Sequence, residues 1–126
     1  MKTTLLSAGA LLLLLLGGLG NSVYLSHRCA AWERQLDSAE EAVTQEQWAA
    51  AQSQLEALYR SWDKCEPYLH IVAHHEDVEQ SLVLLEQCRL FAALEDGDAL
   101  LSAGEQLRCQ YRHLAETEEL RLQNIL

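Results

Sequence analysis

Three histidines and the acidic residues beside them are the only cluster in the sequence whose residue types suit chemistry. His70 and His74 are four residues apart, so on a helix both imidazoles can face one metal ion, with Glu66 or Asp77 as an oxygen ligand. A zinc protease motif would place a glutamate directly after the first histidine, where this sequence has Ile71. The spacing is common, and it predicts weak metal binding at most. The full cluster is His70, His74, His75, Glu76, Asp77 and Glu79.

The sequence has no signature of nucleophilic or phosphate chemistry. It contains no GxSxG, no glycine-rich phosphate loop and no pair of carboxylates in a cleft-like context. We therefore expect a protein that is not an enzyme and uses no cofactor. His75 falls on an apolar line between Ile71 and Val78, where a buried, hydrogen-bonded histidine is the simpler interpretation. The tryptophans also occupy core positions, so the predicted structural core includes Trp32, Trp48, Trp62 and His75.

Four cysteines are the remaining reactive side chains, and none of them forms a CxxC pair. If the chain folds as helical hairpins around turns near residue 45 and near residue 97, Cys29 meets Cys65 and Cys88 meets Cys109. We predict these two disulfides, each worth about 3 kcal/mol in the chain-entropy model. The alternative is four buried free thiols.

A leucine-rich run from Leu5 to Leu25 has no charged residue. At about 1.5 Å per residue it reaches about 31 Å, the thickness of the hydrocarbon core of a bilayer. Lys2 precedes the run and an acidic segment follows it, so we expect the N-terminus in the cytoplasm and the rest outside the cell membrane. The alternative is a cleaved signal peptide with Gly18 to Gly20 as the cleavage site.

The rest of the chain is acidic and helical in composition. The net charge is -10, and all nineteen acidic residues follow the leucine-rich run. Nucleic acid is therefore a poor partner. One proline, few glycines beyond the run and no alternating apolar pattern argue for long helices rather than strands.

Apolar residues at alternating steps of three and four predict the elements. The first seam continues from the leucine-rich run into the soluble part: Leu25, Cys29, Trp32, Leu36, Ala39 and Val43. Thr44 and Gln47 form a capping box, with Val43 and Trp48 as a hydrophobic staple, so a second helix begins near Gln45 and ends at Pro67.

A third helix is predicted from Pro67 to about Glu95, with Gly97 as its C-terminal cap. Asp98 caps a fourth helix, and Thr117 caps a last short one. The apolar residues of that last helix should dock on the bundle: Leu120, Leu122, Ile125 and Leu126.

The order of these features resembles a small bacterial family of membrane-anchored proteins, domain of unknown function 4363. Trp48 opens a helix, Trp62 closes it, His74 to Glu79 lie on the next helix, and the chain closes with Asn124-Ile125-Leu126. The family has Glu-Ile where this chain has Asp77-Val78, and the cysteines are an addition. The resemblance covers nearly the whole chain and implies a membrane-anchored helical protein with no assigned activity.

Together these patterns predict an all-α fold, in which an N-terminal transmembrane helix continues into a small antiparallel bundle of two αα-hairpins. We expect an anchor over residues 1–28 and an extracytoplasmic bundle over residues 29–126. The predicted function is an interaction or scaffolding module with a protein partner. The alternatives are metal or ligand binding by His70, His74 and His75, and a secreted domain released by signal cleavage.

Overall fold

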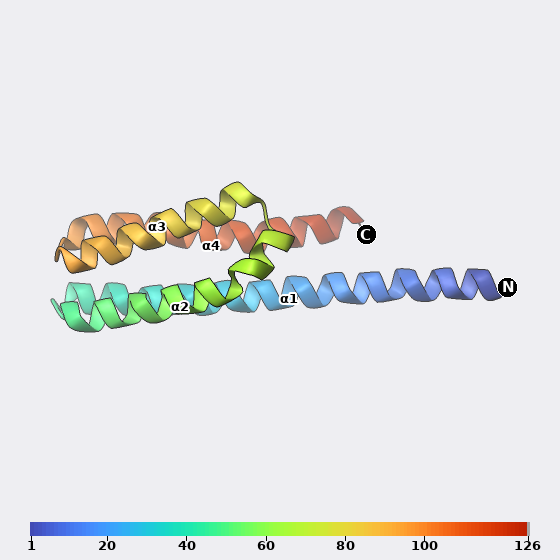
Figure 1. The fold of residues 1–126 in the computed structure, drawn as a ribbon, viewed down its shortest axis with the longest axis horizontal. Coiled ribbons are helices and arrows are strands. Elements are labelled where there is room, and N and C mark those ends of the chain that lie inside the picture. Colours follow the sequence, from blue (N-terminus) through green and yellow to red (C-terminus); the bar gives the residue numbers. More distant parts are fainter. Residues whose placement is uncertain (126) are drawn as a thin grey trace.

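The computed structural model describes residues 1–125, without the side chains of residues 121, 122 and 125. It consists of four α-helices in an up-and-down order (Figure 1). The predicted all-α class is therefore confirmed. The helices are α1 (Lys2–Thr44), α2 (Trp48–Val72), α3 (His75–Ala93) and α4 (Gly97–Ile125).

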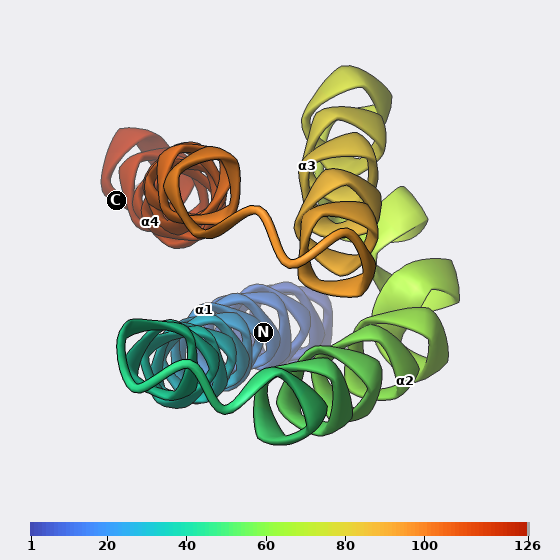
Figure 2. The same cartoon turned by 90° about the vertical axis from the view of Figure 1, so that its left-hand side faces the viewer.

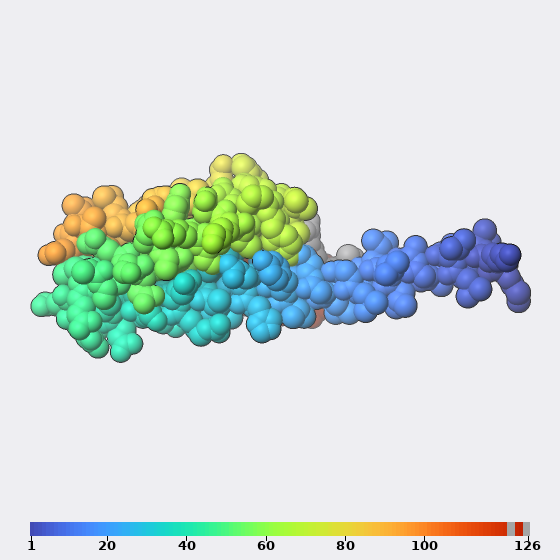
Figure 3. Space-filling model, turned by 60° about the horizontal axis from the view of Figure 1, so that its bottom comes forward, coloured from blue at the N-terminus to red at the C-terminus, as the bar shows by residue number. Residues whose placement is uncertain are grey.

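The first helix is one uninterrupted rod of 43 residues, as the continuous seam predicted. Its N-terminal part projects from the bundle as a bare arm, whereas its C-terminal part packs in the bundle (Figures 1 and 3). Most side chains of residues 2–20 are exposed. All six residues of the predicted seam are buried: Leu25, Cys29, Trp32, Leu36, Ala39 and Val43.

The four helices surround a single core. Viewed along the bundle, α1 lies beside α2 and α4, and α3 completes the arrangement between α2 and α4 (Figure 2). Each helix contributes residues at steps of three and four, because that spacing places them on one face. The centre of the core contains Trp32, Trp62, Tyr111, Leu36, Leu55, Leu58, Leu85 and Leu107.

The turn between α1 and α2 differs from the predicted capping box. Thr44 is the last residue of α1, and its hydroxyl donates to the Glu41 carbonyl at 2.7 Å instead of capping α2. The chain turns because Glu46 adopts a left-handed conformation, with φ of 58°. The Gln47 amide then donates back to the Ala42 carbonyl at 2.8 Å, which is the pattern of a Schellman turn. This turn satisfies the last carbonyls of α1, and α2 begins at Trp48 without a side-chain cap.

Pro67 does not end the second helix, contrary to the prediction. It lies inside α2, which continues to Val72, and the end of α2 bends toward α3 in Figure 1. A proline removes one hydrogen bond and kinks a helix, but packing on both sides can keep the helix going. The chain instead breaks at Ala73 and His74, whose backbones are extended, and α3 begins at His75.

The turn between α3 and α4 repeats the geometry of the first turn. Glu95 is left-handed with φ of 54°, and the Asp96 amide donates to the Phe91 carbonyl at 2.9 Å. The cap of α4 is Asp96, whose carboxylate accepts from the Ala99 amide at 3.2 Å, so the predictions for Gly97 and Asp98 were wrong. Gly97 is the first residue of α4 and packs close to Val43 and Trp48.

The fourth helix runs without interruption to Ile125, so Thr117 does not start a separate helix. The Thr117 hydroxyl donates to the His113 carbonyl one turn earlier, at 2.7 Å. The predicted docking of Leu122, Ile125 and Leu126 lies outside the described side chains. Leu120, the remaining member of that patch, is 58% exposed.

Candidate functional site

The histidine cluster lies where α2 ends and α3 begins. The His70 and His75 Nδ1 atoms are 3.3 Å apart, and their ring centroids are 5.2 Å apart. The outer nitrogen of each ring faces a carboxylate: His70 Nε2 is 3.3 Å from Glu66, and His75 Nε2 is 2.8 Å from Glu79. Such carboxylate contacts orient a histidine ring and fix its tautomer.

The break between α2 and α3 changes which histidines meet. His74 is the exposed N-cap residue of α3, so the predicted pairing of His70 with His74 on one helix is wrong. The expectation of a buried His75 is also wrong, because its side chain is 69% exposed. The predicted apolar line required one helix through residues 68–78, and Ile71 on that line is 83% exposed. The two corrections have the same cause, the extended residues Ala73 and His74.

Within the described residues, no group of three or more His, Cys, Asp or Glu side chains is placed to hold a metal ion. In this region, His70 and His75 together offer an ion two nitrogen ligands. A separate contact links α4 to α3, because His113 Nε2 lies 3.3 Å from the Asp77 carboxylate.

All four cysteines are free thiols, so neither predicted disulfide is present. Cys29 and Cys65 are at similar heights in the bundle, since Tyr24 packs on Tyr68 and the Trp32 indole donates to Ser61. A similar height is not enough, because a disulfide also requires the two Cβ atoms to face each other at a short distance.

The second predicted disulfide, Cys88–Cys109, is absent because only one of its two thiols is buried. Cys88 is fully buried in the core, whereas Cys109 is exposed on the outer face of α4. Two side chains on opposite faces of their helices cannot be joined without moving the backbone. Burial, followed by the charge of Glu40, raises the pKa of the Cys88 thiol to about 12, so this sulfur stays protonated and unreactive.

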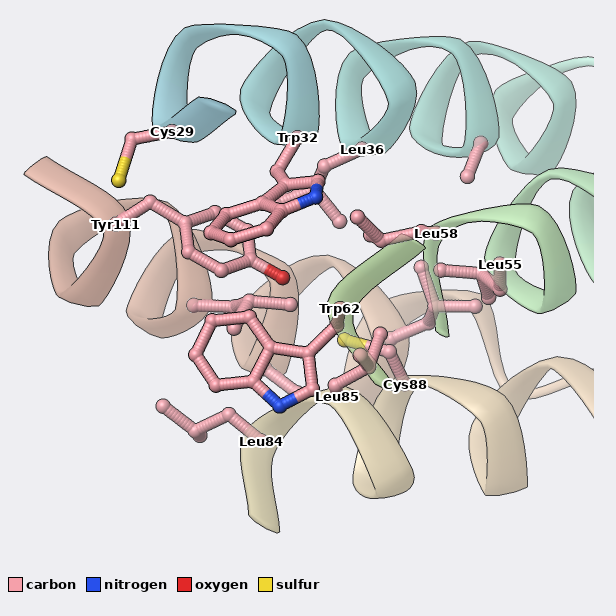
Figure 4. Packing of buried hydrophobic residues seen from close by; sticks show 14 of the residues in the cluster. Cys29, Trp32, Leu36, Leu55, Leu58, Trp62, Leu84, Leu85, Cys88 and Tyr111 are labelled. Atoms are coloured by element: carbon pink, nitrogen blue, oxygen red, sulfur yellow. The ribbon is translucent and has the colours of Figure 1, made fainter. Parts of the chain in front are cut away.

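Three aromatic side chains from three helices meet at the centre of the core (Figure 4). The ring of Trp32 lies 5.0 Å from that of Trp62 and 5.5 Å from that of Tyr111. Trp32 donates its indole N–H to Ser61 at 2.9 Å, whereas the Trp62 indole and the Tyr111 hydroxyl are buried without a partner among the described residues. Burial raises the Tyr111 pKa well above its usual value. Trp48 is only partly buried and packs at the edge of this core.

A line of polar contacts, here called the α1–α4 seam, joins α1 to α4 at the surface of the bundle. Arg108 donates to Glu40 at 2.8 Å and to Asp37 at 2.5 Å, with only 12% of its side chain exposed. Burial lowers the Arg108 pKa, but the hydrogen bonds and charges of Glu40 and Asp37 outweigh this effect and raise it. Gly104 makes room for this contact, because a Cβ at residue 104 would collide with the Glu40 carboxylate.

This seam continues to the base of the arm. Asn21 donates to the Glu118 carboxylate at 2.7 Å, and the Tyr68 hydroxyl lies 3.5 Å from the Asn21 carbonyl. Asn21, which lies within the expected anchor of residues 1–28, therefore contacts both α2 and α4.

The sequence did not single out the opposite end of the bundle, where both hairpin turns lie side by side. There a shallow groove is lined by Trp48, Leu94 and Leu101 together with the turn residues Glu46 and Glu95. The available signal was a tryptophan beside Glu46 in the first turn and leucines beside Glu95, Asp96 and Asp98 in the second, but two turns far apart in sequence meet only in the folded bundle.

The fold defines a class of protein: an all-α bundle built on a long N-terminal helix. Among the described residues, one helix, α1, is long and apolar enough to cross a membrane, and none of the residues in the qualifying window is buried. The chain belongs to the family described as Domain of unknown function (DUF4363), whose family model matches residues 20–125. This match confirms the family resemblance in the sequence. No curated protein and no solved structure matches the chain.

Proposed function

We propose that this protein is a single-pass membrane protein that presents its bundle as an interaction or scaffolding module outside the cytoplasmic membrane. The observation that carries the proposal is the division of α1 into an exposed apolar arm and a buried seam. A helix segment that is apolar on all sides and largely exposed suits a lipid environment. At about 1.5 Å per residue, residues 2–20 reach about 28 Å, close to the hydrocarbon thickness of a bilayer.

The contacts at Asn21 support a bundle that sits directly on the membrane surface. No linker separates the arm from the bundle, because Ser22 and Leu25 are already buried within the same helix. A rigid connection fixes both the height and the orientation of the bundle, which suits a module that must meet a partner at a set distance from the bilayer.

The outer face of α3 and its C-cap support an interaction role. Val83 and Leu90 of α3 are 49% and 54% exposed, and the C-cap residue Leu94 is 65% exposed. Their spacing of seven and four residues places them on one side of the helix. Exposed apolar side chains that line up along one face are typical of surfaces that bind another protein.

Cys109 provides a native probe for the orientation. In sealed right-side-out vesicles, a membrane-impermeant maleimide should label Cys109, the exposed thiol, without permeabilisation. Lys2→Cys in a Cys109→Ser background is the matched control, and it should be labelled only after the vesicles are opened.

The reverse pattern would overturn the proposed topology. Recovery of the chain from the soluble fraction, with about twenty N-terminal residues missing by intact mass, would favour the secreted alternative.

A second candidate function is metal binding by His70 and His75. The favouring observation is the 3.3 Å separation of their Nδ1 atoms, which is close to the spacing of two ligands on one tetrahedral ion with metal–nitrogen distances of about 2.0–2.1 Å. Glu66 and Glu79 on the outer nitrogens would hold both rings in place.

Titration of the full chain with zinc, followed by calorimetry, tests this candidate. Stoichiometric micromolar binding that is lost in His70→Ala and His75→Ala, but kept in the exposed control His27→Ala, would support it. Equal weak binding by all four proteins would exclude it.

A further inference from the structure

We infer that the groove at the membrane-distal end of the bundle is a docking site for a cationic amphipathic segment of a partner protein. This inference names the partner class of the proposed interaction role and rests on that role. The groove is lined by residues of the two hairpin turns and of the helix ends beside them. Figure 1 shows these turns at the opposite end of the bundle from the arm. Its volume is about 610 Å³.

The floor of the groove is apolar. Trp48 is partly buried there, against Val43 and Gly97, and Leu94 and Leu101 beside it are 65% and 37% exposed. A partly buried tryptophan with two exposed leucines offers the kind of contact area that anchors a helix or an extended segment.

Every charged residue on the rim of the groove is acidic. Glu46, Glu95, Asp96 and Asp98 line it, and no Lys, Arg or His does. In the part of the chain that the structure describes, no ion pair involves Glu46, Glu95 or Asp98. Carboxylates without internal cations around an apolar floor complement a segment that carries Lys or Arg beside its apolar residues.

The backbone conformation of two rim residues also supports a binding role for the groove. Glu46 and Glu95 hold left-handed conformations, with φ of 58° and 54°, in equivalent positions of the two turns. Glycine is the residue that takes this conformation at the lowest cost. A glutamate at both positions keeps a carboxylate on the rim at the expense of stability, which is the pattern of strained residues at binding surfaces.

The geometry relative to the membrane also suits a docking site. About twenty-four residues of α1 separate the arm from the first turn, which places the groove about 36 Å above the membrane-side end of the bundle. A partner bound there is held away from the lipid headgroups, and α1 connects the bundle to the membrane as one continuous helix.

The test uses the full chain in nanodiscs of zwitterionic phosphatidylcholine. The probe is a fluorescein-labelled helical peptide with leucines at positions i, i+3 and i+7 and lysines on the flanking faces. A comparison peptide keeps the leucines and replaces each lysine with glutamate. Binding is followed by fluorescence anisotropy, with empty nanodiscs as the blank, at about 0.05 M and about 0.5 M salt.

The lysine peptide should bind, and the glutamate peptide should not. The double variant Glu46→Gln and Glu95→Gln should weaken binding by about five- to ten-fold at low salt, since each substitution removes the attraction of one rim carboxylate for a lysine. The matched control is Glu116→Gln with Glu119→Gln, which makes the same change of net charge at the other end of α4 and should alter binding less than about two-fold. Leu94→Ser should also weaken binding, and circular dichroism checks that each variant is folded.

Equal weakening by both double variants would overturn the inference, because it would reduce the effect to overall charge. Absence of lysine-peptide binding, or equal binding of the two peptides, would overturn it as well. These outcomes are independent of the Cys109 labelling experiment, so failure of the groove and failure of the membrane topology can be told apart.

Discussion

Residues 2–20 and residues 22–44 belong to one helix but have opposite surroundings. In the first segment, apolar side chains face outward on all sides, and the most exposed leucines include Leu5 at 74% and Leu13 at 72%. In the second segment, apolar residues form one stripe that packs against α2 and α4, while acidic residues cover the other faces. Both segments form a helix through local hydrogen bonds, but different surroundings stabilise them. The first segment suits lipid, whereas close packing against the side chains of α2 and α4 stabilises the second.

The sharpest test of this contrast removes one large side chain from each segment. Trp32→Ala should lower the free energy of unfolding by about 3–5 kcal/mol, because it opens a cavity between the Trp62 and Tyr111 rings. Leu13→Ala in the arm should leave bundle stability unchanged. Urea unfolding of the full chain in nanodiscs, followed by far-UV circular dichroism, measures both, and equal losses would remove the distinction between the segments.

Alkaline pH should weaken the bundle segment selectively. Burial raises the pKa of the Cys29 and Cys88 thiols from 9.0 to about 12, so the unfolded chain loses these protons at lower pH than the folded chain does. Their contribution is complete below about pH 9 and is lost as the pH rises toward about 12. Thermal unfolding across this range should show a falling Tm, and Cys29→Ala with Cys88→Ala should flatten the fall.

A Tm that stays level over the same range in the unaltered chain would contradict the contribution of these thiols. The accessible reference is Cys109, which is exposed, so Cys109→Ala should leave the slope unchanged.

The α1–α4 seam supplies a smaller and more specific test. Arg108→Met should cost about 2–3 kcal/mol, because it leaves the partly buried Glu40 without its cation. Arg112 pairs with Glu33 in the same seam, but the Arg112 side chain is 60% exposed. Arg112→Met should therefore cost less than about 0.5 kcal/mol. Paired denaturation curves decide the matter, and similar costs would mean that the seam is stabilised by charge rather than by burial.

At the two turns the expected change is a small gain of stability. Glu46→Gly and Glu95→Gly should each raise stability by about 0.5–1 kcal/mol, since glycine relieves the left-handed backbone of each turn. Both turns lie at the far end of the bundle segment, so the membrane arm is not affected. The same denaturation assay measures the gain, and a loss on either substitution would mean that the glutamate side chain supports the turn.

Much of the fold could be predicted from spacing alone. The steps of three and four through Leu25, Cys29 and Trp32 identified the buried face of α1 because side-chain direction on a helix is fixed by local geometry. The same reasoning placed Trp62 in a seam, where it is fully buried. Helix ends were predicted less well, since Thr44 and Gly97 suit more than one role at a turn.

The candidate sites depended on contacts between segments, which spacing does not contain. Pro67 was compatible with a helix end, but packing carried α2 past it and moved the break to Ala73 and His74. That shift exposed His75 and replaced the predicted His70–His74 pair with His70–His75. The cysteine pairings failed because a matching height does not bring two Cβ atoms within disulfide distance, as at Cys29 and Cys65, or place both thiols in the core, as at Cys88 and Cys109.

The sequence by itself determined that the chain is helical, acidic beyond an apolar N-terminal run, and continuous from that run into the first bundle helix. These properties follow from composition and from the helical period, which act over one or two turns. Only the tertiary structure decided where α2 breaks, which histidines meet, and that the two acidic turns form one groove. Those outcomes depend on residues far apart in the chain, and the packing of four helices brings them together.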